Sequence, residues 1–175
     1  SSRRRILAPA GRFFRTVGIT VTSPDREIGT WDQPIIENIK QGVIGLLVRR
    51  VSGHPYFLLQ AKAEFGNRPH VQIGPTVQFT PGNYEDNIKL KKPFLYSEFI
   101  TPGALGKVVH DSFQSEEGAR FLCEAHLHRV IEVHEDWDRE LPDNFRWFSL
   151  DATRFFLHLG EEVNSCARSI LTCLL

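Results

Sequence analysis

Histidine and glutamate recur at alternate positions between residues 126 and 134. The segment HLHRVIEVH places its acid and imidazole side chains two or four residues apart, at His126, His128, Glu132 and His134. Alternate side chains of a strand project to one side, and imidazole and carboxylate groups are common ligands of zinc. One hypothesis is therefore a catalytic metal on this strand. The alternative, which we favour, is a set of surface or partly buried histidines.

The residues before this segment predict a helix from about 115 to 125. Ser115 is followed by Glu116 and Glu117, and the helix dipole favours acidic residues in the first turn. Apolar residues 121, 122 and 125 continue one face of that helix. A strand is expected to follow at 130–133.

A β-hairpin is the most strongly patterned element. GVIGLLVRR at 42–50 is rich in β-branched and aliphatic residues, and YFLLQAKA at 56–63 follows it after a glycine-containing turn. Alternation in the second strand places Gln60 and Lys62 on one face. HVQIGPTVQFT at 70–80 predicts another strand, interrupted at Gly74-Pro75 because proline cannot donate a ladder hydrogen bond.

The remaining pattern predicts turns and two closing helices. Pro81-Gly82-Asn83 reads as a turn and 83–93 as a surface loop, while Asp151 and Asn164 are expected to cap helices at 152–159 and 165–174. We expect an α+β fold with a mixed β-sheet flanked by helices and no internal repeat.

Composition excludes several classes of function. The chain has 175 residues, with 21 basic and 21 acidic side chains, so no net charge draws it onto nucleic acid or anionic lipid. No apolar run is long enough for a membrane span. We therefore expect a soluble cytoplasmic protein with neither nucleic acid nor a membrane as partner.

The three cysteines, Cys123, Cys166 and Cys173, lack the spacing of a zinc site and are odd in number. We expect buried, reduced thiols. The sequence begins with Ser1 and contains no methionine, so we do not expect it to begin at a natural start.

Several strings along the chain together resemble the NDP-hexose 2,3-dehydratases, enzymes of deoxysugar and antibiotic biosynthesis. In order they are RFFR (12–15), REIGTWDQPII (26–36), QAKAEFGN (60–67), PTVQFTPGNY (75–84), QSEEGARF (114–121), RWFSL (146–150) and NSCARSILTCL (164–174). The resemblance covers nearly the whole chain.

The resemblance implies a Nudix-like fold and a protein about double this length, made of two similar repeats, of which this chain resembles the C-terminal one. We expect an N-terminal arm and lead-in strand at 1–25 and a single repeat at 26–175. The metal-binding box of Nudix hydrolases is absent, since the glutamates at 116 and 117 lack the Arg-Glu turn before them. Diphosphate hydrolysis is therefore disfavoured.

The activity implied is loss of water across carbons 2 and 3 of an NDP-4-keto-6-deoxyglucose, with dTDP as the expected nucleotide. The carbon 4 ketone acidifies the hydrogen on carbon 3, so a base, an acid and donors for the enolate oxygen suffice. We expect no cofactor and no metal. The diketo product would pass to an NADPH-dependent 3-ketoreductase.

The matching strings suggest the site residues. Catalytic roles are expected for Lys62, Glu64, Tyr84, His110 and Glu116. Substrate contacts are expected from Trp31, Gln33, Gln60, Asn67, Gln78, Asn83, Gln114 and Ser115. The expected helix start near residue 115 would supply free amides for an anion. Ordinary packing, capping or solvated charge is the alternative for each residue.

Departures from the family pattern keep other functions open. Where the family continues with an Asn-Arg pair, this chain has His126 and Leu127, so a guanidinium is missing that Arg129 or the histidines would have to replace. A repeat that binds nucleotide sugar without catalysis is one alternative, and a homodimer that recreates the two-repeat architecture is expected for the active form. A metal-dependent enzyme similar to cupins is disfavoured, because arginines stand at 120 and 139 where the motif needs glycines.

Overall fold

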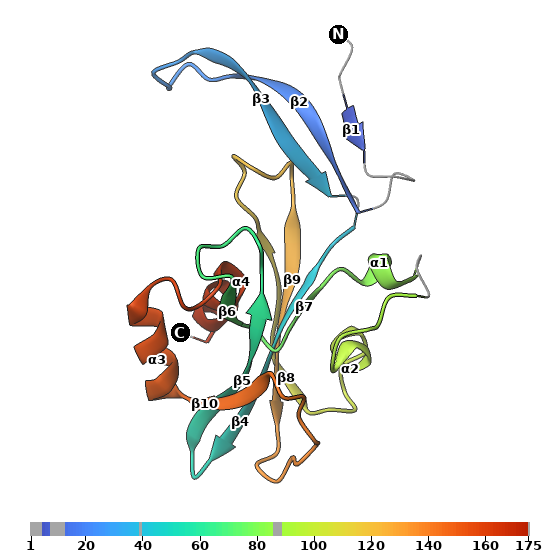
Figure 1. Cartoon of the computed structure of the whole chain (residues 1–175), viewed down its shortest axis with the longest axis vertical. Helices are drawn as coiled ribbons and strands as arrows, with labels where there is room; N and C mark the ends of the chain where they lie inside the picture. Colours follow the sequence, from blue (N-terminus) through green and yellow to red (C-terminus); the bar gives the residue numbers. More distant parts are fainter. Residues whose placement is uncertain (1–4, 8–12, 39, 86–88, 175) are drawn as a thin grey trace.

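The computed structural model describes residues 5–7, 13–38, 40–85 and 89–174, which form two sheets (Figure 1). The smaller sheet is antiparallel, in the order β1 (Arg5–Leu7), β2 (Phe14–Thr22) and β3 (Thr30–Asn38). The β2–β3 hairpin projects away from the body of the molecule (Figure 1). The expected boundary between residues 25 and 26 falls in the turn of this hairpin, and the division into an arm and a repeat stays a prediction.

The larger sheet forms the body of the molecule. Its order is β10 (Phe145–Ser149), β5 (His54–Ala63), β4 (Val43–Val51), β9 (Ala125–Val133) and β8 (Lys107–Ser115). The β4 and β9 pair is parallel and the other pairs are antiparallel, so the sheet is mixed as expected. β4 and β5 confirm the predicted hairpin.

The predicted strand at 70–80 is broken where proline interrupts it. β6 (Val71–Gly74) pairs with β5, whereas β7 (Val77–Phe79) pairs with β4. The buried hydroxyl of Thr76 accepts a hydrogen bond from Leu47 N at 2.8 Å and donates one to Leu58 O at 2.5 Å. One threonine therefore satisfies both main chains where β4 and β5 separate.

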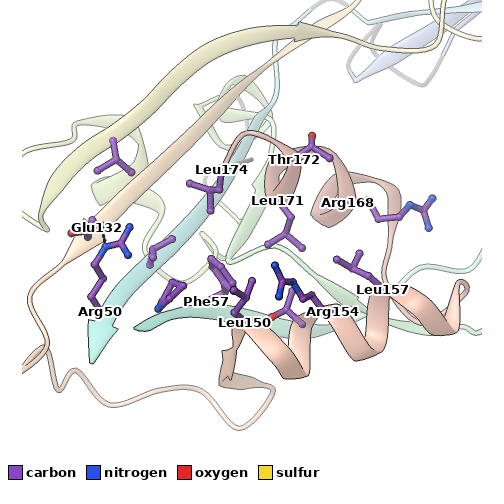
Figure 2. Close-up of a pocket in the computed structure, with 14 residues that line it drawn as sticks. Arg50, Phe57, Glu132, Leu150, Arg154, Leu157, Arg168, Leu171, Thr172 and Leu174 are labelled. Carbon is purple, nitrogen blue, oxygen red and sulfur yellow. Dashed lines mark hydrogen bonds and ion pairs between the residues drawn. The ribbon is translucent and has the colours of Figure 1, made fainter. Parts of the chain in front are cut away.

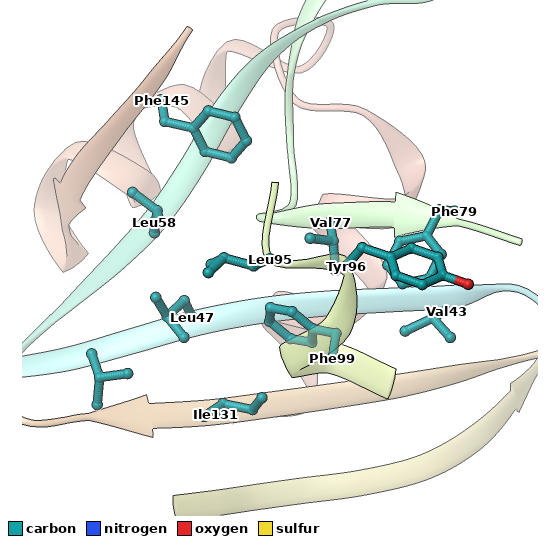
Figure 3. Packing of buried hydrophobic residues seen from close by; sticks show 11 residues of the cluster. Val43, Leu47, Leu58, Val77, Phe79, Leu95, Tyr96, Phe99, Ile131 and Phe145 are labelled. Carbon is teal, nitrogen blue, oxygen red and sulfur yellow. The ribbon is translucent and has the colours of Figure 1, made fainter. Parts of the chain in front are cut away.

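Hydrophobic clusters cover both faces of the larger sheet. On one face, residues of β4, β7 and β9 surround Phe99 of α2 (Tyr96–Ile100), which is fully buried (Figure 3). On the other face, α3 (Leu150–Leu159) and α4 (Ser165–Thr172) cover residues such as Ile44 and Val130. The α+β class and the flanking helices are thus confirmed.

The helix predicted at 115–125 is wrong. β8 runs to Ser115 and pairs with β9 as far as Ala125, and the segment between them is a series of turns. Residues 107–115 pair with β9, and their side chains alternate between half-buried and exposed, as expected for a strand with one covered face. Glu117 O accepts from Arg120 N at 2.9 Å, so the acidic pair begins a turn and no helix. The strand predicted at 130–133 begins earlier, at Ala125.

Other boundaries also differ. The turn predicted at 81–83 is a short helix, α1 (Pro81–Glu85), and part of the predicted 83–93 loop lies outside the described residues. Ser149, not Asp151, caps α3, whereas Asn164 caps α4 as predicted. α4 ends at Thr172. Cys123 is exposed, contrary to the expectation of buried thiols.

Among the described residues, no helix is long and apolar enough to cross a membrane.

Candidate active site

A small polar cavity of about 100 Å³ lies where the end of β8 and the middle of β9 meet the first turns of α4. Its lining residues are Gln114, Ser115, Glu116, His128, Ser165, Cys166 and Ser169. Antiparallel pairing of β8 with β9 places Gln114 opposite His126 and Ser112 opposite His128. The predicted residues Gln114, Ser115 and Glu116 therefore do meet at one cavity, although no helix begins there.

His128 and Ser169 form the inner wall of the cavity. Burial, the largest influence, lowers the pKa of His128, which is 2% exposed, so its imidazole is neutral. Its Nδ1 lies 3.1 Å from the carbonyl of His126, which can only accept, so Nδ1 carries the proton. Nε2 is then an acceptor for the Ser169 hydroxyl at 2.8 Å, and that hydroxyl is also 3.0 Å from Cys166 O. His128 thus orients Ser169 toward the cavity wall.

A second polar group, on β5 and β6, lies near the start of α4. Lys62 forms an ion pair with Glu64, each with about a quarter of its side chain exposed. Asn67 Nδ2 donates to Glu64 Oε2 at 3.0 Å and also to Gln72. The predicted residues Lys62, Glu64 and Asn67 therefore form one network, which Gln72 completes.

Asn164 connects this network to α4. Gly74 has no side chain, and a Cβ there would lie 3.3 Å from atoms of Lys62 and 3.5 Å from Asn164 Nδ2. Asn164 caps the helix through Ala167 N at 2.8 Å and donates to Gln78 Oε1 at 3.3 Å. Gln78, also predicted for the site, thus lies beside the helix start.

The thiol of Cys166 is influenced by both polar groups. Its pKa is raised to about 11, mainly by burial and then by the Glu116 and Glu64 carboxylates, while Lys62 opposes them. Charges from the cavity and from the β5 network therefore act on one atom of the first turn of α4. This region therefore contains one cation, Lys62, two carboxylates, Glu64 and Glu116, and several polar donors. Such groups can carry out acid–base chemistry on a polar substrate.

Four predicted residues lie elsewhere or have other contacts. Tyr84 and Asn83 belong to α1, and Tyr84 packs against Phe79 and Tyr96 in the cluster on the opposite face of the sheet. Gln60 Nε2 donates to the carbonyls of residues 75 and 76, each at 3.0 Å. Trp31 Nε1 donates to Gln33 Oε1 at 2.7 Å on the projecting hairpin.

Gln33 and His110 contribute to the frame around the cavity. Gln33 Nε2 donates to Ala119 O at 2.9 Å, which joins the hairpin to the turns after β8. His110 Nε2 lies 2.7 Å from Ser112 Oγ, and both side chains are on the same face of β8 as Gln114.

The family's missing guanidinium is not replaced by Arg129. Arg129 is 9% exposed and forms a bidentate pair with Asp111, while Nη1 donates to Phe99 O at 2.7 Å. Its side chain therefore joins β8, β9 and α2 and is unavailable to a diphosphate.

The spaced histidines and glutamate do not assemble a metal site. Glu132 pairs with Arg50, and the exposed His134 contacts Asp136 at 2.5 Å. His126 Nε2 lies near Glu116 and Glu124, whereas His128 Nε2 contacts Ser169. Within the described ranges, no group of three or more His, Cys, Asp and Glu side chains is placed to hold a metal ion.

Sequence reasoning missed Glu124 and the α4 residues Ser165, Cys166 and Ser169. Ser165, Cys166 and Ser169 lie in the predicted closing helix and in a string that carried the resemblance, but no site role was predicted for them. The alternation of His126 with His128 was the available signal for the β9 face. Glu124 offered none, because its contacts come from residues far away in the sequence.

A larger cavity of about 680 Å³ lies between α3, α4 and the strands (Figure 2). Its floor is apolar, with Phe57, Leu150 and Leu171, and Arg154 and Arg168 stand among its lining residues. Its one carboxylate, Glu132, pairs with Arg50 at 3.2 Å. A large apolar pocket is ordinarily the first candidate for a ligand site, but this one offers no free acid or base. We therefore assign the chemistry to the polar cavity.

A family model described as NDP-hexose 2,3-dehydratase matches residues 1–174 of the chain. The chain is 35% identical to a dTDP-4-dehydro-6-deoxy-alpha-D-glucopyranose 2,3-dehydratase of Saccharopolyspora spinosa, over 94% of this chain and 34% of that protein. It is 30% identical to a protein of the same name from Streptomyces violaceoruber, over 98% of this chain and 38% of that protein. The chain therefore spans about a third of these relatives, not the half that was expected.

Among solved structures, the chain is similar to C. elegans Ap4A hydrolase, with a TM-score of 0.43 and 17% identity over 78% of this chain and 99% of that chain. The Nudix-like arrangement stays an expectation drawn from the family resemblance.

Proposed function

The chain belongs to the NDP-hexose 2,3-dehydratase family, and on that premise we propose that it removes water from a nucleotide-linked 4-keto-6-deoxyglucose at the cavity beside α4. The observation that supports this most is the polar cavity lined by Glu116 and the first turn of α4, with the Lys62–Glu64 ion pair near enough to influence the Cys166 thiol. The names of the relatives favour a dTDP-linked substrate, and we propose that nucleotide for this chain.

The proposed reaction needs no oxidant or reductant. A base removes the carbon 3 proton, and its electron pair forms an enolate with the carbon 4 oxygen. When the carbonyl re-forms, the electrons make a bond between carbons 3 and 2, and the carbon 2 to oxygen bond breaks. The protonated base gives the proton that it took from carbon 3 to the departing oxygen, so that water leaves. The resulting enol tautomerises to a 3,4-diketo-2,6-dideoxy sugar.

We assign the base to Glu116, because it is the carboxylate that lines the cavity, with 27% of its side chain exposed. Such a carboxylate contributes about a hundred- to ten-thousandfold as a general base. The ammonium of Lys62, oriented by Glu64, would stabilise the negative charge that develops on the carbon 4 oxygen.

The backbone amides and Ser165 at the start of α4 would contact the diphosphate, since a helix N-terminus favours anions. Gln114 and Gln78 would contact sugar hydroxyls. Tyr84 lies on the opposite face of the sheet, so we do not propose it as the acid.

We propose that the active form is a homodimer in the cytoplasm and that an NADPH-dependent 3-ketoreductase consumes the unstable diketone. Light scattering of the native protein tests the dimer, and a strict monomer with full activity would exclude it.

A coupled assay tests the activity itself. The purified chain is incubated with dTDP-4-keto-6-deoxyglucose, the ketoreductase and NADPH, and formation of the 2-deoxy sugar is followed. We expect turnover that requires the chain. Saturable binding of dTDP without turnover would indicate a nucleotide-sugar-binding repeat that lacks catalysis, and absence of both would refute the proposal.

A further inference from the structure

A buried carboxylate, Glu124, and the imidazole of His126 lie near Glu116. Nε2 of His126 lies 3.2 Å from Glu124 Oε1 and 3.6 Å from Glu116 Oε1. Glu124 is nearly fully buried, with 4% of its side chain exposed, whereas Glu116 lines the cavity. One nitrogen therefore faces two carboxylates.

The tautomer of His126 follows from a backbone contact. Gly42 donates its N–H to His126 Nδ1 at 3.1 Å, so Nδ1 must be the unprotonated nitrogen and Nε2 carries the hydrogen. This contact requires glycine, because a Cβ at residue 42 would lie 2.9 Å from Nδ1. The N–H of His126 is thus directed toward the two carboxylates.

Glu124 needs this donor. Its Oε1 also accepts from Asn38 Nδ2, at the end of the projecting hairpin, while its Oε2 is buried without a hydrogen-bond partner among the described residues. A buried carboxylate is costly unless hydrogen bonds compensate it. Glu124 therefore holds His126 in place, and Asn38 holds Glu124.

We infer that His126 is a positioning residue that, through its Nε2–H, keeps the Glu116 carboxylate directed at the cavity. This inference rests on the proposed role of Glu116 as the base. Like charges in contact disfavour ionisation, and a donated hydrogen bond favours it. The distance of 3.6 Å is longer than a hydrogen bond, and such contacts often tighten when substrate binds. The other titratable groups that line the cavity with Glu116 are His128 on β9 and Cys166 on α4, and both are neutral near pH 7. The charged Lys62–Glu64 pair also acts on the Cys166 thiol.

The pH dependence of kcat/KM tests the inference. In His126→Phe the donor is lost, and in Gly42→Ala the ring is displaced, so the acidic limb of the profile should move to higher pH by on the order of one pH unit. His126→Gln carries an amide N–H near the position of Nε2 and should keep the limb of the wild type. His54→Phe, at the exposed first residue of β5, is the matched control and should leave the profile unchanged. An unmoved limb in both His126→Phe and Gly42→Ala would overturn the inference.

A second measurement separates this inference from the proposed function. ¹⁵N NMR of histidine-labelled protein should show His126 protonated at Nε2 alone, with a resonance that shifts in Glu116→Gln. If the chain showed no turnover, the dehydratase proposal would be refuted, but the NMR measurement would still test the positioning role of His126. Protonation at Nδ1, or no response to Glu116→Gln, would overturn the positioning role.

Discussion

Arg129 and Asp111 form a bidentate pair across β8 and β9, with Nη2 2.8 Å from Oδ2 and Nε 3.2 Å from Oδ1. Because Arg129 also donates to Phe99 O, this pair connects the sheet to α2.

Asp111→Ala should lower the free energy of unfolding by about 1–3 kcal/mol, since it leaves a largely buried guanidinium without its carboxylate. Urea denaturation measures the change. Asp136→Ala, whose partner His134 is exposed, is the control and should change stability by less than about 0.5 kcal/mol. Equal losses in the two variants would show that the Arg129 pair has no special role.

The stability of the chain should depend on pH through His128. Burial lowers the pKa of this imidazole from 6.5, so below about that pH the unfolded chain binds a proton that the folded chain does not. The free energy of unfolding should therefore fall as the pH drops from 7.5 to 5, and it should fall less in His128→Gln. Parallel curves for the two proteins, from urea denaturation at each pH, would contradict the buried neutral imidazole.

Gly45 allows α2 to approach the sheet. A Cβ at this position would lie 2.3 Å from a ring carbon of Phe99 and 2.5 Å from a methyl group of Val77. Gly45→Ala should cost about 1–3 kcal/mol of unfolding free energy through overpacking. Gly18→Ala adds the same atom where nothing lies within 4 Å, so its thermal unfolding should match the wild type. A Gly45→Ala protein as stable as Gly18→Ala would mean that α2 does not pack as described.

Lys62→Ala removes the ammonium group and should reduce kcat by about a hundred- to a thousandfold. A loss of this size is typical of a group that stabilises transition-state charge. Steady-state rates in the coupled assay measure this. Lys107→Ala, at an exposed position on β8, should keep the rate of the wild type. A similar small effect of both substitutions would remove Lys62 from the proposed mechanism.

The sequence predicts local elements well where patterning and turn chemistry agree. The β4–β5 hairpin, the break at Pro75 and the cap at Asn164 all follow from residues that are neighbours in the chain. The segment after Gln114 misled the prediction, because Ser115 and two glutamates resemble a helix start whereas pairing with β9 keeps residue 115 in a strand.

The candidate site could be predicted only in part. Lys62, Glu64 and Asn67 are close in the sequence, and their network follows from a strand and its loop. The contacts of Glu124 with Asn38 and of Gly42 with His126 join positions that are 86 and 84 residues apart, and neither periodicity nor spacing indicates them. Tertiary packing alone brings these groups near the cavity.

The proposed function depends on proton abstraction from carbon 3 at the cavity beside α4. The most direct test supplies dTDP-4-keto-6-deoxyglucose deuterated at carbon 3 and follows release of deuterium to water by NMR, with no coupling enzyme present. We predict release by the wild-type chain and its loss in Glu116→Gln. Saturable binding of the sugar nucleotide with deuterium fully retained, or equal release by Glu116→Gln, would contradict the account.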